Sequence, residues 1–261
     1  MDVKAENWRA LATGIDGRVL HASPAGAESV AELRLIRVDP KAVSIRVLVS
    51  KDFGREATTA KDFADRSGAL AVINAGYYDK KLRPLGLLVA EGKRKKRFVN
   101  RRGRQSDALY EGVFLVKGGL PVIQRNEHYR PAGEEVAVQA GPLLIAGGKP
   151  ASSLRGLRDA KRLDGRTVLS LDGEGRLVIW VTASPLSGMN WCELRDLMVR
   201  YGEWDNGPES GKIGIGWALN LDGGASAQLY VRVDGAKGKS LGVQGAPVPV
   251  ALGFFSRNIE R

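Results

Sequence analysis

The strongest chemical signal in the sequence is a short run of polar and flexible residues at the end of a predicted strand. It contains Asp222, Gly223, Gly224 and Ser226. Functional groups of sheet proteins often gather at the carboxyl ends of strands, where this acid would lie. Two successive glycines allow backbone amides to turn toward an anion, and the serine could add a hydroxyl. The alternative is a plain hairpin turn leading into a strand at Leu229–Val233.

Two further segments combine apolar strands with residues that bend the chain. Asn74 and Gly76 directly follow the apolar run Leu70–Ile73, and both residue types tolerate left-handed backbone conformations. Gln139 ends another strand, and Gly141 with the proline after it must break the ladder, because proline has no N–H. Gln139 would then point its amide into the space that the bend opens. Plain turns, with Gln139 exposed, explain both segments equally well.

A fourth segment places a cation at the mouth of a predicted hairpin. Arg166 and Thr167 begin its first strand, Thr167–Leu171, which a turn at Asp172 joins to Leu177–Val181. Arginine donates two parallel hydrogen bonds and is a good phosphate clamp, although a charged residue there is usually exposed. Asp172 precedes a glycine between two strands, so we interpret it as a turn former and not as a catalyst.

The scarcity of histidine and cysteine excludes several kinds of site. The chain has only His21, His128 and Cys192. One chain therefore cannot assemble a histidine-rich or cysteine-rich zinc centre, and a single thiol makes no internal disulfide. A Ser-His-Asp arrangement would need one of two histidines that we interpret as surface residues. We predict no cofactor, and a divalent cation near Asp222 stays open.

The charge balance favours anionic partners. Lysine and arginine number 40 against 29 acids, a formal net charge of +11, which attracts nucleic acid, anionic lipid or acidic envelope polymers. The segment Lys93–Arg104 is the densest basic strip and could dock onto an anionic wall polymer or a membrane surface. A solvated hairpin tip is the alternative. Only Phe98 is interleaved with these cations, so nucleic-acid recognition by base stacking is poorly supported.

The elements that must position these residues are mostly short strands. Strands are expected at residues 30–38, 43–49, 70–73, 85–89, 112–116, 136–139, 167–171, 177–181, 217–221 and 229–233. Thr59 to Arg66 reads as a helix capped by Thr59. A second helix is expected from Trp191 to Tyr201, with Asn190 as its cap and Glu193 reaching back to it. We predict an α+β fold with mixed, mostly antiparallel sheets and a few flanking helices, in one domain over residues 1–261.

Together and in this order, the segments resemble the phosphodiester glycosidase family. The resemblance rests on residues 74–78, 84–86 with 91–93, 139–142, 166–167, 220–224 with 226, and 249–253, and spans about residues 72–254. The form of residues 180–198 and of Leu221–Ser226 is closer to bacterial branches. Ala225 departs from the family pattern, since many relatives carry another glycine there.

The resemblance implies a location outside the cytoplasm. Bacterial members are commonly exported, which suggests a periplasmic or extracellular protein whose signal peptide was removed before Met1. The segment Met1–Asn7 itself has no basic-then-apolar signal pattern, and no run approaches the roughly 18 apolar residues of a membrane span. A cytoplasmic protein is the alternative.

The resemblance also implies an activity: hydrolysis of a sugar-1-phosphodiester bond in an anionic glycan or glycoconjugate. Departing phosphate is already acidic, so one essential carboxylate can serve where ordinary glycosidases use two. Asp222 would be the nucleophile or the base that activates water. Arg166 would hold the phosphate, helped by the two glycine amides. Substrate contacts are expected from Asn74, Gly76, Gln139, Gly141, Thr167, Gly223, Gly224 and Ser226. The alternatives are a non-catalytic envelope module that binds anionic polysaccharide, and a phosphodiesterase that cuts P–O.

Overall fold

Antiparallel strands make up most of the fold. The computed structural model describes residues 1–23, 30–100, 105–155, 157, 159–183, 188–204, 214–233 and 240–257. Within them every strand pairing is antiparallel. The predicted α+β class, with antiparallel sheets and a few flanking helices, is confirmed.

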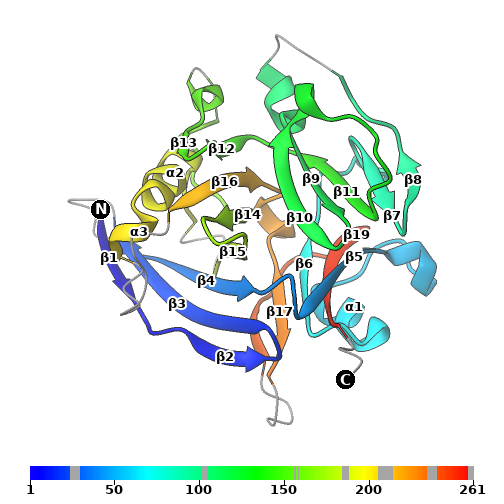
Figure 1. The fold of residues 1–261 in the computed structure, drawn as a ribbon, viewed down its shortest axis with the longest axis horizontal. Helices are drawn as coiled ribbons and strands as arrows, with labels where there is room; N and C mark the ends of the chain where they lie inside the picture. The colour runs from blue at the N-terminus through cyan, green and yellow to red at the C-terminus, as the bar shows by residue number, and fades with distance from the viewer. Residues whose placement is uncertain are drawn as a thin grey trace.

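The strands form three sheets (Figure 1). The nine-stranded sheet has the order β1 (Asp2–Ala5), β3 (Ile15–Ser23), β4 (Ala31–Val38), β15 (Leu177–Thr182), β14 (Thr167–Asp172), β16 (Ile215–Asn220), β12 (Leu143–Ala146), β13 (Lys149–Pro150), and β2 (Arg9–Ala12) pairs with β3. A five-stranded sheet, called here the β8 sheet, has the order β10 (Leu120–Arg125), β9 (Gly112–Lys117), β11 (Val136–Ala140), β7 (Leu88–Ala90), β8 (Lys93–Lys96). The other, called the β6 sheet, has the order β18 (Ser240–Val243), β17 (Leu229–Arg232), β6 (Ala71–Asn74), β19 (Val250–Ser256), β5 (Val43–Val49).

Within the described part of the chain three helices flank the sheets, and both predicted caps are confirmed. α1 (Ala60–Ser67) lies beside the β6 sheet, and the Thr59 side chain accepts a hydrogen bond from the Asp62 amide. α2 (Trp191–Val199) lies beside β12 and β13. Asn190 and Glu193 form its capping box, in which each side chain bonds to the other's backbone amide. The helix was expected to reach Tyr201, but it ends at Val199 and a short α3 (Tyr201–Trp204) follows.

One apolar core connects the three sheets. Its largest cluster of buried residues includes Ile36 and Leu169 of the nine-stranded sheet, Phe114 of the β8 sheet, and Ile73 and Leu252 of the β6 sheet. A single domain over residues 1–261 stays a prediction. Among the described residues no helix has the length and apolar character that a bilayer span requires.

The first three strands were not predicted. His21, which we interpreted as a surface residue, lies within β3 and is half-buried. The alternation of buried and exposed residues in β3 is hidden by Arg18, which lies in the middle of the strand. Arg18 is only 3% exposed, and its guanidinium carbon lies 4.2 Å from the centre of the Trp8 ring. A cation buried under an aromatic ring reads as an exposed position in a hydrophobicity pattern.

The chain passes from one sheet to another at three of the four chemically suggestive segments. After Asn74 it leaves the β6 sheet for β7, after Gln139 it leaves the β8 sheet for β12, and after Asn220 it leaves the nine-stranded sheet for β17. β16 and β17 therefore form no hairpin, and Gln139 is fully buried. The plain-turn alternatives are wrong for Asp222 and for Gln139, because both segments are crossovers.

Candidate active site

Asp222 lies just beyond β16 and is held by the end of β6. Its backbone N–H donates to Ala75 O at 3.2 Å, and its carbonyl accepts from Asn74 Nδ2 at 2.7 Å. The carboxylate is half-buried and accepts from the Gly223 amide at 3.0 Å. Hydrogen bonds between the end of β6 and the backbone of Asp222 therefore fix the position of this acid.

The surroundings of Asp222 suit it to proton transfer. The pKa of this carboxyl is raised to about 6, chiefly by burial and least by the charge of Asp164, while hydrogen bonds from the Ser226 hydroxyl and the Gly223 amide act in the opposite direction. A carboxyl group with a pKa near neutrality can accept a proton during turnover and release it afterwards.

The two glycines shape the turn, but their amides are already engaged. Gly223 N donates to the Asp222 carboxylate, and Gly224 N donates to Gly165 O at 2.8 Å. Gly224 has a φ of 61°, a left-handed conformation that favours glycine. The sequence suggested that both amides cradle an anion. The structure corrects this, because each amide has an acceptor within the protein.

Two hydroxyl groups lie next to each other at this turn. Ser226 ends the short 3-10 turn Gly224–Ser226, and its hydroxyl lies 3.0 Å from that of Tyr78. Ser226 was predicted to contact the substrate and Tyr78 was not, although Tyr78 ends the segment that begins at Asn74. The Ser226 hydroxyl donates its one proton to the Asp222 carboxylate, so the Tyr78 hydroxyl is the donor in this pair.

Arg166 is a buried cation stacked on an aromatic ring. It is only 6% exposed, and its guanidinium carbon lies 4.6 Å from the centre of the Trp191 ring. Nε donates to Met189 O at 2.9 Å and Nη2 to Arg162 O at 2.7 Å. Nη1 makes no hydrogen bond within the described residues. Burial lowers the pKa of Arg166, and the charge of Asp164 opposes that effect.

Asn74 and Thr167 face each other behind Asp222. Both side chains are buried, and Thr167 Oγ1 donates to Asn74 Oδ1 at 2.7 Å. Asn74 Oδ1 also accepts from Gln228 N at 3.1 Å. The polar atoms of both side chains are thus bonded within the protein. These bonds fit side chains that hold the backbone around Asp222 in place better than side chains that contact the substrate directly, as the sequence predicted.

Gln139 has a similar supporting place. Its Oε1 accepts from Leu87 N and Val99 N, both at 3.0 Å, and its Nε2 donates to Val99 O and Tyr110 O at 2.8 and 2.9 Å. All the hydrogen-bonding capacity of the amide is used by three separate backbone segments. Gln139 therefore joins the chain that follows β8 to the crossover before β12.

The glycines expected at the site allow close backbone approach. A side chain at Gly141 would overlap Ala108 O, and one at Gly76 would lie 3.1 Å from Gln139 O. The peptide Gly141–Pro142 is cis. Glycine is needed at position 141 because the backbone of another segment occupies the place of a side chain, whereas at position 76 a side chain would be tightly packed.

Asn220 and Tyr77 connect the three segments in which the chain passes between sheets, and neither was predicted to have a role. Asn220 Nδ2 donates to Tyr77 Oη at 3.0 Å and to Gly141 O at 3.1 Å, while its Oδ1 accepts from Trp191 Nε1 at 3.0 Å. Tyr77 Oη donates to Gly141 O at 2.6 Å. Burial, and secondly the charge of Asp222, raise the pKa of Tyr77. Both residues lie inside the segments that carry the resemblance, which was the available signal.

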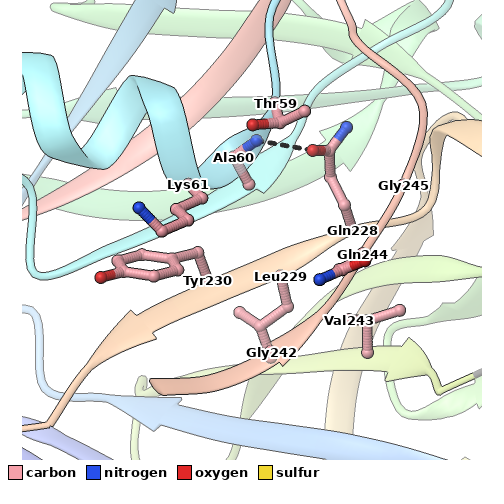
Figure 2. Close-up of a pocket in the computed structure, with 10 residues that line it drawn as sticks. All are labelled: Thr59, Ala60, Lys61, Gln228, Leu229, Tyr230, Gly242, Val243, Gln244 and Gly245. Atoms are coloured by element: carbon pink, nitrogen blue, oxygen red, sulfur yellow. Dashed lines mark hydrogen bonds between the residues drawn. The ribbon is translucent and has the colours of Figure 1, made fainter. Parts of the chain in front are cut away.

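A cavity of 320 Å³ lies at the amino end of α1 (Figure 2). Gln228 forms part of its wall, and its Oε1 accepts from Ala60 N at 2.6 Å. The same amide donates to Ser226 O at 3.3 Å and to Ala246 O at 2.9 Å. Gln228 therefore links α1 to the Ser226 turn.

The basic strip is partly described. All four residues of β8, Lys93–Lys96, are exposed on an edge strand of the β8 sheet. Residues 101–104, which complete the predicted strip, lie outside the described residues.

Comparisons with known proteins identify relatives of the sequence and of the fold. The family model described as phosphodiester glycosidase matches residues 67–255. A search of curated proteins found no match.

Solved structures share the fold at low identity. The zebrafish N-acetylglucosamine-1-phosphodiester alpha-N-acetylglucosaminidase catalytic domain, auto-inhibited by its pro-peptide, superposes with a TM-score of 0.67 at 14% identity, over 98% of this chain and 88% of that one. A hypothetical protein from Synechocystis gives 0.62 at 16%, over 94% and 62%. A Burkholderia pseudomallei K96243 protein with the provisional designation of an exported protein gives 0.65 at 11%, over 97% and 96%.

Proposed function

The chain belongs to the phosphodiester glycosidase family, and we propose that it hydrolyses the bond between a sugar's anomeric carbon and a phosphodiester oxygen. The observation that carries the proposal is Asp222. It is the half-buried carboxyl, with a pKa raised to about 6, at the point where β16 leaves its sheet. Its position is set by hydrogen bonds from segments that the family shares.

In the proposed reaction, ionised Asp222 takes a proton from a water molecule. The water oxygen bonds to the anomeric carbon, and the bond from that carbon to the phosphate oxygen breaks. The electron pair leaves with the phosphomonoester, which needs no proton from an acid because it is a weak base. Free sugar and a phosphomonoester are the products, and the proton on Asp222 returns to solvent.

Arg166 is proposed to bind the phosphate through Nη1, while its other two nitrogens stay on the carbonyls of Met189 and Arg162. A guanidinium fixed in this way loses little side-chain entropy when the anion arrives. The hydroxyls of Ser226 and Tyr78 would exchange their present hydrogen bonds for bonds to neighbouring substrate oxygens. Asn74, Gly76, Gln139, Gly141 and Thr167 would position the segments that carry these groups.

The decisive experiment is release of free sugar from a panel of sugar-1-phosphodiesters. The first member should be the methyl phosphodiester of N-acetylglucosamine, since the zebrafish relative is named for N-acetylglucosamine-1-phosphodiester. Hydrolysis in ¹⁸O-labelled water should place the label in the sugar. Label in the phosphate would show P–O cleavage instead, and no release from any glucose, mannose, galactose or N-acetylglucosamine member would contradict the proposed activity.

The pH dependence of turnover follows from the state of Asp222. A base must be ionised, so kcat/KM should rise with pH through about 6 and level off above it. At pH 5 the rate should be on the order of one tenth of the plateau. The measurement is a profile from pH 4.5 to 8.5 with direct detection of the sugar. A profile that is flat, or that falls over this range, would remove Asp222 from the role of base.

We further propose that β8 docks the enzyme onto a polyanionic substrate such as a wall polymer. Its four cations form no ion pair with any residue that the structure describes, and the chain after them is bonded to Gln139 near the site. Replacing all four by glutamine should raise KM for a polymeric phosphodiester by on the order of 10-fold at low salt, and leave KM for the methyl phosphodiester unchanged. Equal KM values for the polymer at low salt would refute the docking role. A matched control removes four scattered exposed cations: Lys4, Arg9, Lys41 and Lys149.

Such a polymer is met outside the cytoplasm, so we also propose that the protein acts after export. The exported designation of the Burkholderia relative supports this. Cell fractionation with an antibody tests it, and recovery in the cytoplasm alone would contradict it.

A further inference from the structure

Asp164 is a second acid that approaches the site closely from another part of the chain. A side chain at Gly188 would overlap Asp164 O, and one at Gly224 would lie 3.3 Å from Asp164 Oδ1. Asp164 also forms an isolated antiparallel bridge with Met189. Gly188 and Gly224 are far apart in the sequence, and because both lack a side chain, Asp164 can approach both of them closely. The carboxylate faces Gly224, two residues after Asp222.

The carboxylate of Asp164 keeps spare hydrogen-bonding capacity. Oδ1 accepts from the amide of Gly165 at 3.0 Å, and Oδ2 lies 3.6 Å from Arg162 Nη2. A carboxylate can accept about four hydrogen bonds. The side chain is 25% exposed, so part of the carboxylate reaches solvent.

Asp164 interacts with both groups that the reaction requires. Its charge raises the pKa of Asp222 and opposes the lowering of the pKa of Arg166. The segment that carries Asp164 is also joined to the turn after Asp222, because Gly224 N donates to Gly165 O at 2.8 Å. Asp164 therefore lies beside that turn, two residues before Arg166.

Building on the proposed function, we propose that Asp164 is a second catalytic carboxylate, which faces the sugar across Gly224 and stabilises the positive charge that develops at the anomeric carbon. As the bond to phosphate lengthens, this carbon and the ring oxygen share a positive charge. Asp164 accepts no proton and forms no bond. Asp222 takes the proton from water, the water oxygen bonds to the carbon, and the electron pair of the broken bond leaves with the phosphomonoester.

The opposing interpretation is structural, since Asp164 accepts from the next amide and could simply shape the turn before Arg166. Two substitutions separate the two. Asparagine keeps an oxygen that can accept from Gly165 N and removes only the charge, whereas alanine removes both. Asp39 is a matched control, because its Oδ1 accepts from the Lys41 amide in the turn between β4 and β5.

The measurement is kcat on the methyl phosphodiester of N-acetylglucosamine, or on the panel member that wild type cleaves. Asp164→Asn should lower kcat on the order of 10²-fold while the urea midpoint stays that of wild type. It should also keep the acid limb of the pH profile and move it to lower pH, because a like charge has gone. Asp39→Asn should match wild type. Wild-type kcat in Asp164→Asn, or an equal loss in Asp39→Asn, would overturn the proposal.

If the proposed function itself is wrong, wild type will release no sugar from any panel member. The role of Asp164 is then judged on the free protein. The carboxyl of Asp222 is titrated by ¹³C NMR in wild type and in Asp164→Asn. A lower midpoint in the variant supports a shared centre, and an unchanged midpoint overturns it.

Discussion

Asp222→Asn is expected to abolish turnover while leaving the fold intact. Asparagine keeps an oxygen that can accept from Gly223 N, and the backbone bonds to Ala75 and Asn74 do not involve the side chain. What is lost is the base, so kcat should fall on the order of 10³-fold or more. Sugar release under saturating substrate measures it. Asp196→Asn, an exposed acid on α2, is the control and should retain full activity.

The same substitution should make the protein more stable at neutral pH. The folded protein holds the Asp222 proton more tightly than the unfolded chain, since the pKa rises from 3.8 to about 6. This contribution to stability is complete below the unfolded pKa and is lost as the pH rises through about 6. Asparagine does not titrate, so the variant should gain up to roughly 3 kcal/mol over wild type at pH 7 and little at pH 4.

Urea unfolding at the two pH values measures that difference. A variant that is inactive and also less stable at pH 7 would indicate that the fold, and not the reaction, needs the carboxylate. Retained activity would keep the reaction class and move the base to another residue. The combination of lost turnover and gained stability is the signature of a side chain kept for chemistry at a cost to the fold.

The elements that the sequence predicted correctly depend on nearby residues. The hairpin of β14 and β15 follows from alternating apolar residues around Asp172-Gly173, and the capping box of α2 follows from Asn190 and Glu193 three positions apart. Asp172 is buried and accepts from the amides of Glu174 and Arg176, so its interpretation as a turn former is confirmed. Each of these features is encoded within a few residues.

What the sequence could not reveal depends on contacts between distant segments. The Asp222 turn looks like a hairpin until β16 and β17 are seen in different sheets, because hydrophobic alternation does not specify a strand's partner. Gln139 could have pointed outward, and only the fold brings Val99 and Tyr110 to its amide. Nothing in the sequence around Asp164, apart from the glycine that follows it, pointed to a role. Asp164 can approach the site only because glycine, which has no side chain, occupies positions 188 and 224.

Arg166→Met is expected to lose both phosphate binding and stability. Methionine fills the space over Trp191 but leaves the carbonyls of Met189 and Arg162 without their donor. Losing two charge-assisted hydrogen bonds from a buried position should lower the free energy of unfolding by about 3 kcal/mol. Loss of the cation should lower kcat/KM on the order of 10²-fold or more.

Because the variant is also destabilised, phosphate binding must be measured separately from folding. Inorganic phosphate should inhibit wild type competitively, and Arg166→Met should be insensitive to it at temperatures well below its unfolding transition. Arg176→Met is the matched control. Arg166 directly precedes β14, and Arg176 bonds to buried Asp172 at the other end of that strand. It should lose stability and keep its sensitivity to phosphate. If both variants stay sensitive, Arg166 supports the Met189 segment and the phosphate is held by other groups; if only Arg166→Met becomes insensitive, the buried cation is the clamp.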